Sequence, residues 1–185
     1  MYNYVICLLH FKFIIFLFKF INNMKLTNFY SNVWIISNFD NEKISTDNLL
    51  TYISKVKQNH NINKTINLDK EFKFWSSTYT SRFNQTISTQ IILDNQKQAI
   101  SMFKKLSRLI TNSFINQQQI LIFTSLKNEC LLGLLVYFIS KEGDVDLEKA
   151  VNTVNSKLGC LSGFHLDPNI KKILISECYT KKLSR

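Results

Sequence analysis

The run from Gln119 to Ile139 reads QILIFTSLKNECLLGLLVYFI. It predicts a short apolar strand over 120–123, then a compact polar loop, then a strongly apolar helix. A strand that leads into a tight loop at the start of a helix directs several unpaired backbone N–H groups toward one point. The positive end of the helix dipole acts on the same point, so this arrangement is suited to holding an anion. The residues inside the loop decide whether it still does so.

The composition is that of a globular protein with an excess of positive charge. The chain has 185 residues, of which 45% are hydrophobic and 19% charged, and its formal net charge is +10. This length fits one domain with a real core. The charge favours acidic partners, nucleic acid or an anionic membrane surface, and a solvated basic surface explains it equally well. No Lys/Arg run is dense enough to choose among these.

Four cysteines are spread along the chain, at Cys7, Cys130, Cys160 and Cys178. None has the paired spacing of a zinc site or a redox motif. We therefore expect reduced thiols in an intracellular, cytoplasmic protein, with no metal and no cofactor.

The first 23 residues differ from the rest. Residues 4–21 form an apolar and aromatic run that His10, Lys12 and Lys19 interrupt. Its length is at the lower limit for a membrane span, and each internal lysine disfavours insertion. It also lacks the basic start and small-residue cleavage site of a signal peptide. Residues 1–23 are thus an anchor, a packed helix, or a segment outside the functional chain, and the folded domain is expected over 24–185.

Apolar periodicity predicts alternating strands and helices from residue 32 onward. Strands are expected at 33–36, 61–68, 91–93 and 120–123, and residues 71–88 are expected to form a loop with uncertain short strands. Helices are expected around 46–56, 100–114, 131–140, 146–157 and 168–179. This order predicts an α/β fold with one central, mostly parallel sheet and helices on both faces.

The order of these parts resembles the cysteine-dependent dual-specificity protein phosphatases over residues 26–174. The run Asn32-Val-Trp-Ile-Ile-Ser37 is similar to an early strand of that family, and the segment of Asp94 followed by Ile100 is similar to its general-acid loop and helix. Residues 120–130 lie where the family has a strand, then His-Cys, five residues and Arg. The helices predicted at 131–140 and 146–157 are similar to the pair that follows. The resemblance implies a tyrosine phosphatase-like fold.

The catalytic loop departs from the family at every chemically defining position. Counting the pattern onto this chain puts Phe123 at the histidine, Thr124 at the nucleophilic cysteine and Lys127 at the glycine. Cys130 stands at the arginine, and Leu131 at the hydroxyl residue that follows it. The resemblance therefore implies a scaffold without its catalytic groups.

These replacements remove the family's chemistry. The family nucleophile acts as a thiolate, whereas the Thr124 hydroxyl needs a general base, and His60 and His165 could reach it only through the fold. Cys130 cannot clamp phosphate oxygens as an arginine does. Glu129 repels a phosphate dianion. Asp94 is either a relic of the general acid or a turn residue at a strand end.

We therefore expect no enzyme activity, and a phosphatase-like module that binds a protein partner, phosphorylated or not. Ser125, Lys127 and Asn128 are the loop residues expected to contact it. One alternative is a basic structural subunit of a larger assembly that contacts RNA. Another is a catalyst with displaced chemistry that uses Cys130, although a buried structural thiol is the simpler interpretation of that residue. Membrane attachment depends on residues 4–21.

Overall fold

The computed structural model describes residues 24–38, 46–68, 85–88, 91, 95–124, 128–159 and 166–179. The predicted apolar segment 1–23 lies outside this range, as do Asp94, Ser125, Lys127 and His165. Within the described part, no helix is long and apolar enough to cross a membrane.

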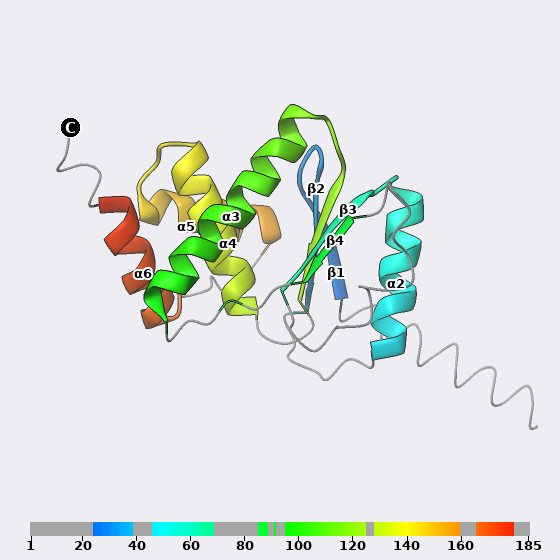
Figure 1. Cartoon of the computed structure of the whole chain (residues 1–185), viewed down its shortest axis with the longest axis horizontal. Helices are drawn as coiled ribbons and strands as arrows, with labels where there is room; N and C mark the ends of the chain where they lie inside the picture. The colour runs from blue at the N-terminus through cyan, green and yellow to red at the C-terminus, as the bar shows by residue number, and fades with distance from the viewer. Residues whose placement is uncertain are drawn as a thin grey trace, which may run out of the picture.

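A five-stranded sheet forms the centre of the molecule (Figure 1). Its strands, in sheet order, are β1 (Met24–Tyr30), β2 (Val33–Asn38), β5 (Ile120–Phe123), β3 (Lys64–Asn67) and β4 (Gln85–Ser88). β1 pairs with β2 in antiparallel fashion, and the other three pairings are parallel. The prediction of a mostly parallel central sheet is confirmed.

Helices cover both faces of the sheet unequally (Figure 1). Among the described helices, α2 (Thr46–Asn59) is the one that covers the first face. The helical layer on the other face consists of α3 (Gln96–Ile115), α4 (Asn128–Glu142), α5 (Leu147–Leu158) and α6 (Pro168–Tyr179). Residues 131–140 of α4 are all buried, as expected of a helix that is apolar all round. α4 is thus the central helix of this layer, in contact with α3, α5 and α6.

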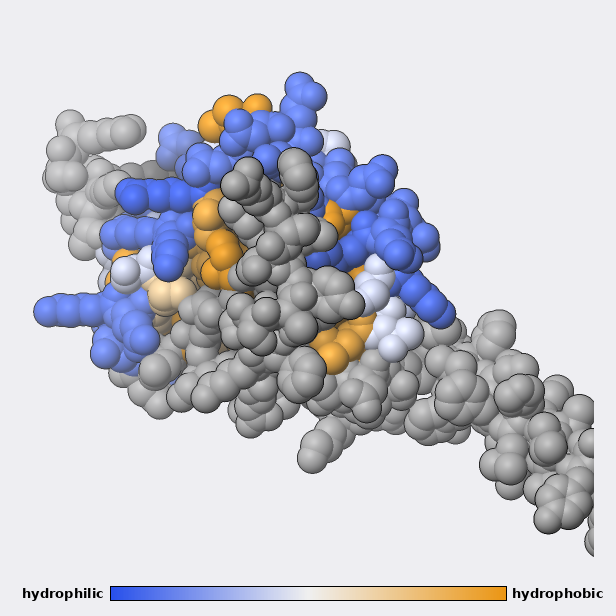
Figure 2. Space-filling view, turned by 45° about the vertical axis from the view of Figure 1, so that its right-hand side comes forward, coloured by the Kyte–Doolittle hydropathy of each residue, from blue (hydrophilic) through white to orange (hydrophobic). Residues whose placement is uncertain are grey.

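Short polar signals set the ends of these helices. The Asn95 side chain accepts a hydrogen bond from Gln98 N at 3.1 Å and caps α3. The Asp146 side chain accepts one from Lys149 N at 2.7 Å and caps α5. Gly159 ends α5 in the left-handed conformation, with φ of 65°. Hydrophilic residues cover most of the described surface seen in Figure 2.

Strand β1 is an element that the sequence analysis did not predict. Its register with β2 shifts between Asn28 and Tyr30, which marks a bulge at Phe29. Because of this extra residue, Phe29 and Tyr30 both pack toward the helical layer rather than on opposite faces. Two lysines join β1 to the end of α5: Lys25 Nζ donates to Leu158 O at 2.6 Å, and Lys157 Nζ donates to Phe29 O at 3.0 Å. The edge strand is thereby fastened to the helical layer.

The strand predicted at 91–93 is wrong at Ile91, and residues 92–93 lie outside the described range. Ile91 is in no strand, although it is buried in the core of the helical layer. The outer parallel strand is instead β4 (Gln85–Ser88), within the segment predicted to be a loop with short strands. A short apolar run is compatible with a strand or with a buried connection, and periodicity alone does not separate them.

Candidate functional site

The candidate site lies between the carboxyl end of β5 and the start of α4. β5 pairs with β2 on one side and β3 on the other, so this connection leaves from the middle of the sheet. It is short, since β5 ends at Phe123 and α4 begins at Asn128. The carboxyl ends of parallel strands are where α/β sheets commonly bind ligands.

Apolar packing anchors the entry to this connection. Phe123 is 1% exposed and belongs to the core under α2, together with Leu49, Ile53 and Ile36. Its carbonyl accepts a hydrogen bond from Leu68 N at 3.0 Å, which extends the pairing of β5 with β3. Thr124 follows and is 3% exposed. Thr124, which the sequence resemblance aligns with the family's nucleophile, is therefore enclosed by the fold.

The exit is anchored on the other face. Leu131 is fully buried in the core of the helical layer. Cys130 is half-buried, and its Sγ lies 3.8 Å from the carbonyl oxygen of Ile91. This contact with a neighbouring segment is compatible with a structural role for the thiol. The same contact brings the segment before Asp94 next to the start of α4.

The middle of the connection is only partly described. Ser125 and Lys127 lie outside the described residues, and of Asn128 the backbone is described as the first residue of α4. Glu129 stands in the first turn of α4 and is half-buried. A carboxylate there interacts favourably with the positive end of the helix dipole, which is the same end that an anion would use.

The histidine that the sequence offered as a base lies at the opposite end of the sheet. His60 stacks on Trp34 with ring centroids 3.8 Å apart, and Trp34 Nε1 donates to Gln119 Oε1 at 2.8 Å. Gln119 immediately precedes β5, whereas Thr124 follows it, so five residue steps separate the two by roughly 17 Å. The structure does not bring His60 to Thr124. The Trp34–His60–Gln119 group has no local sequence signal, because it joins three elements.

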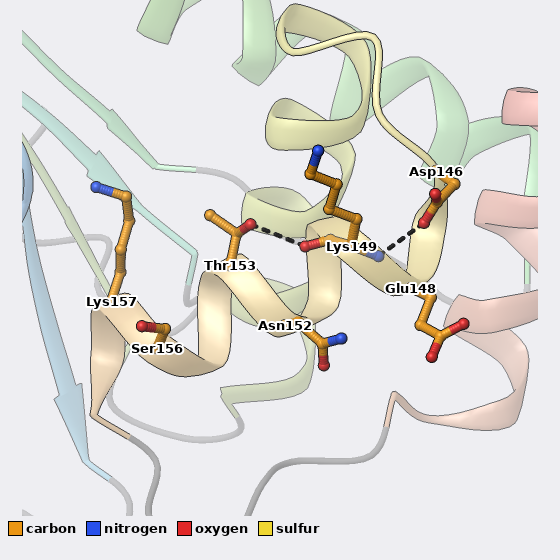
Figure 3. Close-up of a pocket in the computed structure, with 7 residues that line it drawn as sticks. All are labelled: Asp146, Glu148, Lys149, Asn152, Thr153, Ser156 and Lys157. Carbon is orange, nitrogen blue, oxygen red and sulfur yellow. Dashed lines mark hydrogen bonds between the residues drawn. The ribbon is translucent and has the colours of Figure 1, made fainter.

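A hollow of about 720 Å³ lies along the outer face of α5 (Figure 3). It is lined by the polar and charged residues Asp146, Glu148, Lys149, Asn152, Thr153, Ser156 and Lys157. Two hydrogen bonds among these residues lie within α5 and its cap: Asp146 accepts from Lys149 N, and Thr153 Oγ1 donates to Lys149 O at 2.8 Å. Mixed charges on one helix face offer no defined ligand chemistry. Among the described residues, no group of three or more His, Cys, Asp or Glu could hold a metal ion.

Several solved structures share this architecture. The human tyrosine phosphatase-like serine/threonine/tyrosine-interacting protein superposes with a TM-score of 0.60 at 14% identity, over 85% of this chain and 97% of its own. The chain has the fold of the dual-specificity and tyrosine phosphatases. Human DUSP28 matches this phosphatase fold with a TM-score of 0.59 at 9% identity, over 86% of this chain and 95% of its own. The PTP-2 phosphatase of Cydia pomonella gives 0.59 at 16% identity, over 81% and 88%.

No protein-family model and no curated protein matches the sequence. The phosphatase fold is therefore visible in the structure, and the identities of 9–16% do not carry activity with it. A fold hosts many functions, and function has to be argued from the residues of the site. The family resemblance inferred from the order of strands, loop and helices is confirmed at the level of fold.

Proposed function

We propose that this protein is a catalytically inactive member of the phosphatase fold that acts as a protein-binding or regulatory module. The observation that carries the proposal is the pair of residues at the two decisive positions. Thr124 stands where the fold's enzymes have their nucleophilic cysteine, and Cys130 stands where they have their arginine. Both are placed by buried neighbours, Phe123 and Leu131, that keep the framework of the loop.

The nucleophile position supports this proposal. A thiol in such a loop ionises readily because backbone N–H groups and a helix dipole stabilise the thiolate. A threonine hydroxyl does not ionise near neutral pH, so it needs a base within hydrogen-bond reach. His60 is at the far end of β5, and Thr124 is 3% exposed. These observations favour a structural hydroxyl.

The arginine position supports it as well. A guanidinium binds two phosphate oxygens at once, and an arginine in a phosphoryl-transfer site can raise the rate by about 10³ to 10⁵. The Cys130 thiol lies against the Ile91 carbonyl and carries no positive charge to offer. Glu129 adds a negative charge at the start of α4. The electrostatics of the site thus oppose a phosphate dianion.

The proposed recognition surface is the loop between β5 and α4. Ser125, Lys127 and Asn128 are the proposed contacts for a protein partner, because they lie in the loop between the two buried anchors. The proposed partner need not be phosphorylated. The loop would then recognise a binding motif on the partner through uncharged and singly charged contacts.

Hydrolysis of p-nitrophenyl phosphate by the full chain tests the proposal directly. We expect turnover at the level of the buffer blank, and the same value for Thr124→Ala. Turnover that is clearly above the blank and disappears in Thr124→Ala would overturn the proposal. Loss in Cys130→Ser alone would instead point to displaced chemistry on that thiol.

A repaired loop gives a second measurement. The double variant Thr124→Cys/Cys130→Arg restores the two decisive groups, so tungstate or phosphate should raise its melting temperature, by the equivalent of about 2.7 kcal/mol at one hundred times the Kd. The unmodified chain and each single variant should show little shift. An equal shift in the unmodified chain would contradict the loss of anion binding. Absence of a shift in the double variant would assign part of the change to Lys127 and Glu129.

A further inference from the structure

A continuous exposed stripe runs along the outer side of α3, away from the loop. Its six residues are Lys97, Ser101, Lys105, Arg108, Asn112 and Ile115, and all six are exposed. Their spacings of four, four, three, four and three residues keep them within roughly 80° of one another around the helix. From end to end the stripe measures about 27 Å at 1.5 Å per residue. The opposite side of α3 holds the buried Phe103, Leu106 and Ile110.

The stripe is basic, and α3 itself supplies no acidic residue to compensate it. α3 contains four basic and no acidic residues, and it is the only described helix without an Asp or Glu. Lys104 forms an ion pair with Glu177 of α6 at 2.7 Å, but Lys104 lies beside the stripe. Within the described part of the chain, the stripe residues Lys97, Lys105 and Arg108 form no ion pair.

The first turn of α3 adds to this argument. Lys97 stands there beside the positive end of the helix dipole, where a cation is unfavourable and an acidic residue is preferred. Helix stability therefore does not account for a lysine at this position. A negatively charged partner along the stripe would remove the penalty and would pair with Lys105 and Arg108 at the same time.

The far end of the stripe favours a polypeptide over a phosphate backbone. Ile115 is 73% exposed, the larger exposure of the two exposed large hydrophobic residues found in the described chain. A sugar-phosphate backbone has no apolar group to cover it, whereas an amphipathic helix does. The alternation of three and four residues is also the spacing at which one helix packs along another. Charge, spacing and the apolar end agree on the same kind of partner.

We propose that α3 is the docking surface for an acidic amphipathic helix of a partner protein. Its carboxylates face Lys97, Lys105 and Arg108, and one apolar side chain covers Ile115. Ser101 provides an uncharged hydrogen-bonding position between Lys97 and Lys105, and Asn112 provides one between Arg108 and Ile115. α3 lies on the outside of the helical layer with α4 behind it (Figure 1), so a helix can approach without moving the core. This surface is separate from the Thr124 loop, and the proposal holds whether or not that loop is catalytic.

The test titrates the full chain into a fluorescein-labelled, stapled helical peptide of about three heptads. The peptide carries Glu along one face and a Leu at one end, and a peptide of equal composition with its Glu distributed around the helix is the control. Fluorescence anisotropy should show tighter binding of the aligned peptide. Lys105→Glu/Arg108→Glu should weaken it by about 10-fold or more. Ile115→Ser should weaken it by roughly 5-fold.

Lys171→Glu/Lys172→Glu is the matched charge control. These lysines are exposed on α6 in the same helical layer, and the variant changes the net charge by the same amount. It should leave the affinity within about two-fold, since the charges lie off the stripe. Circular dichroism verifies that each variant is folded.

Three results would overturn the proposal. The first is equal affinity for the aligned and the scrambled peptide, and the second is equal weakening by the α6 control variant. The third is that random-sequence double-stranded RNA or phosphatidylserine vesicles bind more tightly than the aligned peptide, and that Ile115→Ser does not change this binding. That result would assign the stripe to phosphate groups. Each outcome is independent of the p-nitrophenyl phosphate assay.

Discussion

The two faces of the sheet are built differently. In the described part of the chain, the helical layer packs α3, α5 and α6 around α4, whereas α2 is the one helix over the smaller core of the other face. The loop lies where the two cores meet, since Phe123 belongs to the core under α2 and Leu131 to the core of the helical layer. Both ends of the loop are therefore held by burial. The framework of the loop thus depends on apolar packing at Phe123 and Leu131.

A matched pair of truncations tests this difference and should have the largest effect. Leu134 of α4 and Leu49 of α2 are both buried. Replacing a buried leucine by alanine costs about 2 to 5 kcal/mol of unfolding free energy, and the cost is higher where the surroundings cannot collapse. Leu134 is enclosed by neighbouring helices, while Leu49 stands in the first turn of α2. Leu134→Ala should lie near the upper limit and Leu49→Ala near the lower.

Urea unfolding followed by circular dichroism measures both values. Equal slopes against urea for the two variants would show that the midpoints report stability. A larger loss for Leu49→Ala would mean that α2, rather than the helical layer, dominates the stability of the framework.

The strongly periodic elements could be predicted from the sequence. The predicted strand 120–123 and helix 168–179 have the bounds of β5 and α6, and the helix predicted around 100–114 lies within α3. Each of these segments has its burial pattern within a single run of residues. The order of such elements was sufficient to predict the phosphatase fold.

Elements whose burial depends on distant partners were not predicted. β1 alternates weakly, and only its pairing with β2 and the contacts of Lys25 and Lys157 with opposing carbonyls define it. Ile91 was assigned to a strand because it is apolar, yet its burial comes from the helical layer. Pairing and packing across the chain override local preference in both cases.

The candidate site likewise has one part that the sequence predicts and another part that required the structure. The proposed replacements at Thr124 and Cys130 rest on the sequence alone, once the strand and helix around them are predicted. The location of His60 at the amino end of β5 and the contact of Cys130 with Ile91 required the structure, since both join segments far apart in the chain. The predicted roles of Ser125, Lys127 and Asn128 stay predictions.

A smaller effect is expected at Gly133, which lets α4 approach its neighbours. A Cβ added there would lie 2.9 Å from Ile170 Cγ2 and 3.0 Å from Phe103 Cζ. Gly133→Ala gains up to about 1 kcal/mol of helix propensity and loses about 1 to 3 kcal/mol through overpacking. Thermal unfolding should show a net loss. Ser101→Ala on the exposed stripe of α3 is the control and should be neutral or slightly stabilising, so equal behaviour of the two variants would refute the close approach.

The smallest effect is expected on the melting temperature under alkaline conditions, in a comparison of one tyrosine on each face of the sheet. Burial raises the pKa of Tyr30, which packs on the helical layer. It also raises the pKa of Tyr52, a residue of α2 that packs against the core on the other face of the sheet. Their contribution to stability is complete below the unfolded-state pKa of about 10 and is lost as the pH rises through the higher folded-state pKa.

Tyr52→Phe should therefore flatten the fall in melting temperature above about pH 10, because phenylalanine cannot ionise. Tyr30→Phe should do so less. Lys157 lies 4.0 Å from the centroid of the Tyr30 ring, and its positive charge favours the phenolate and offsets part of the burial. Melting temperatures recorded between about pH 8 and pH 11 decide this order. A steeper fall in either variant would contradict a raised tyrosine pKa, and a larger effect at Tyr30 would mean that Lys157 does not offset burial on the helical-layer face.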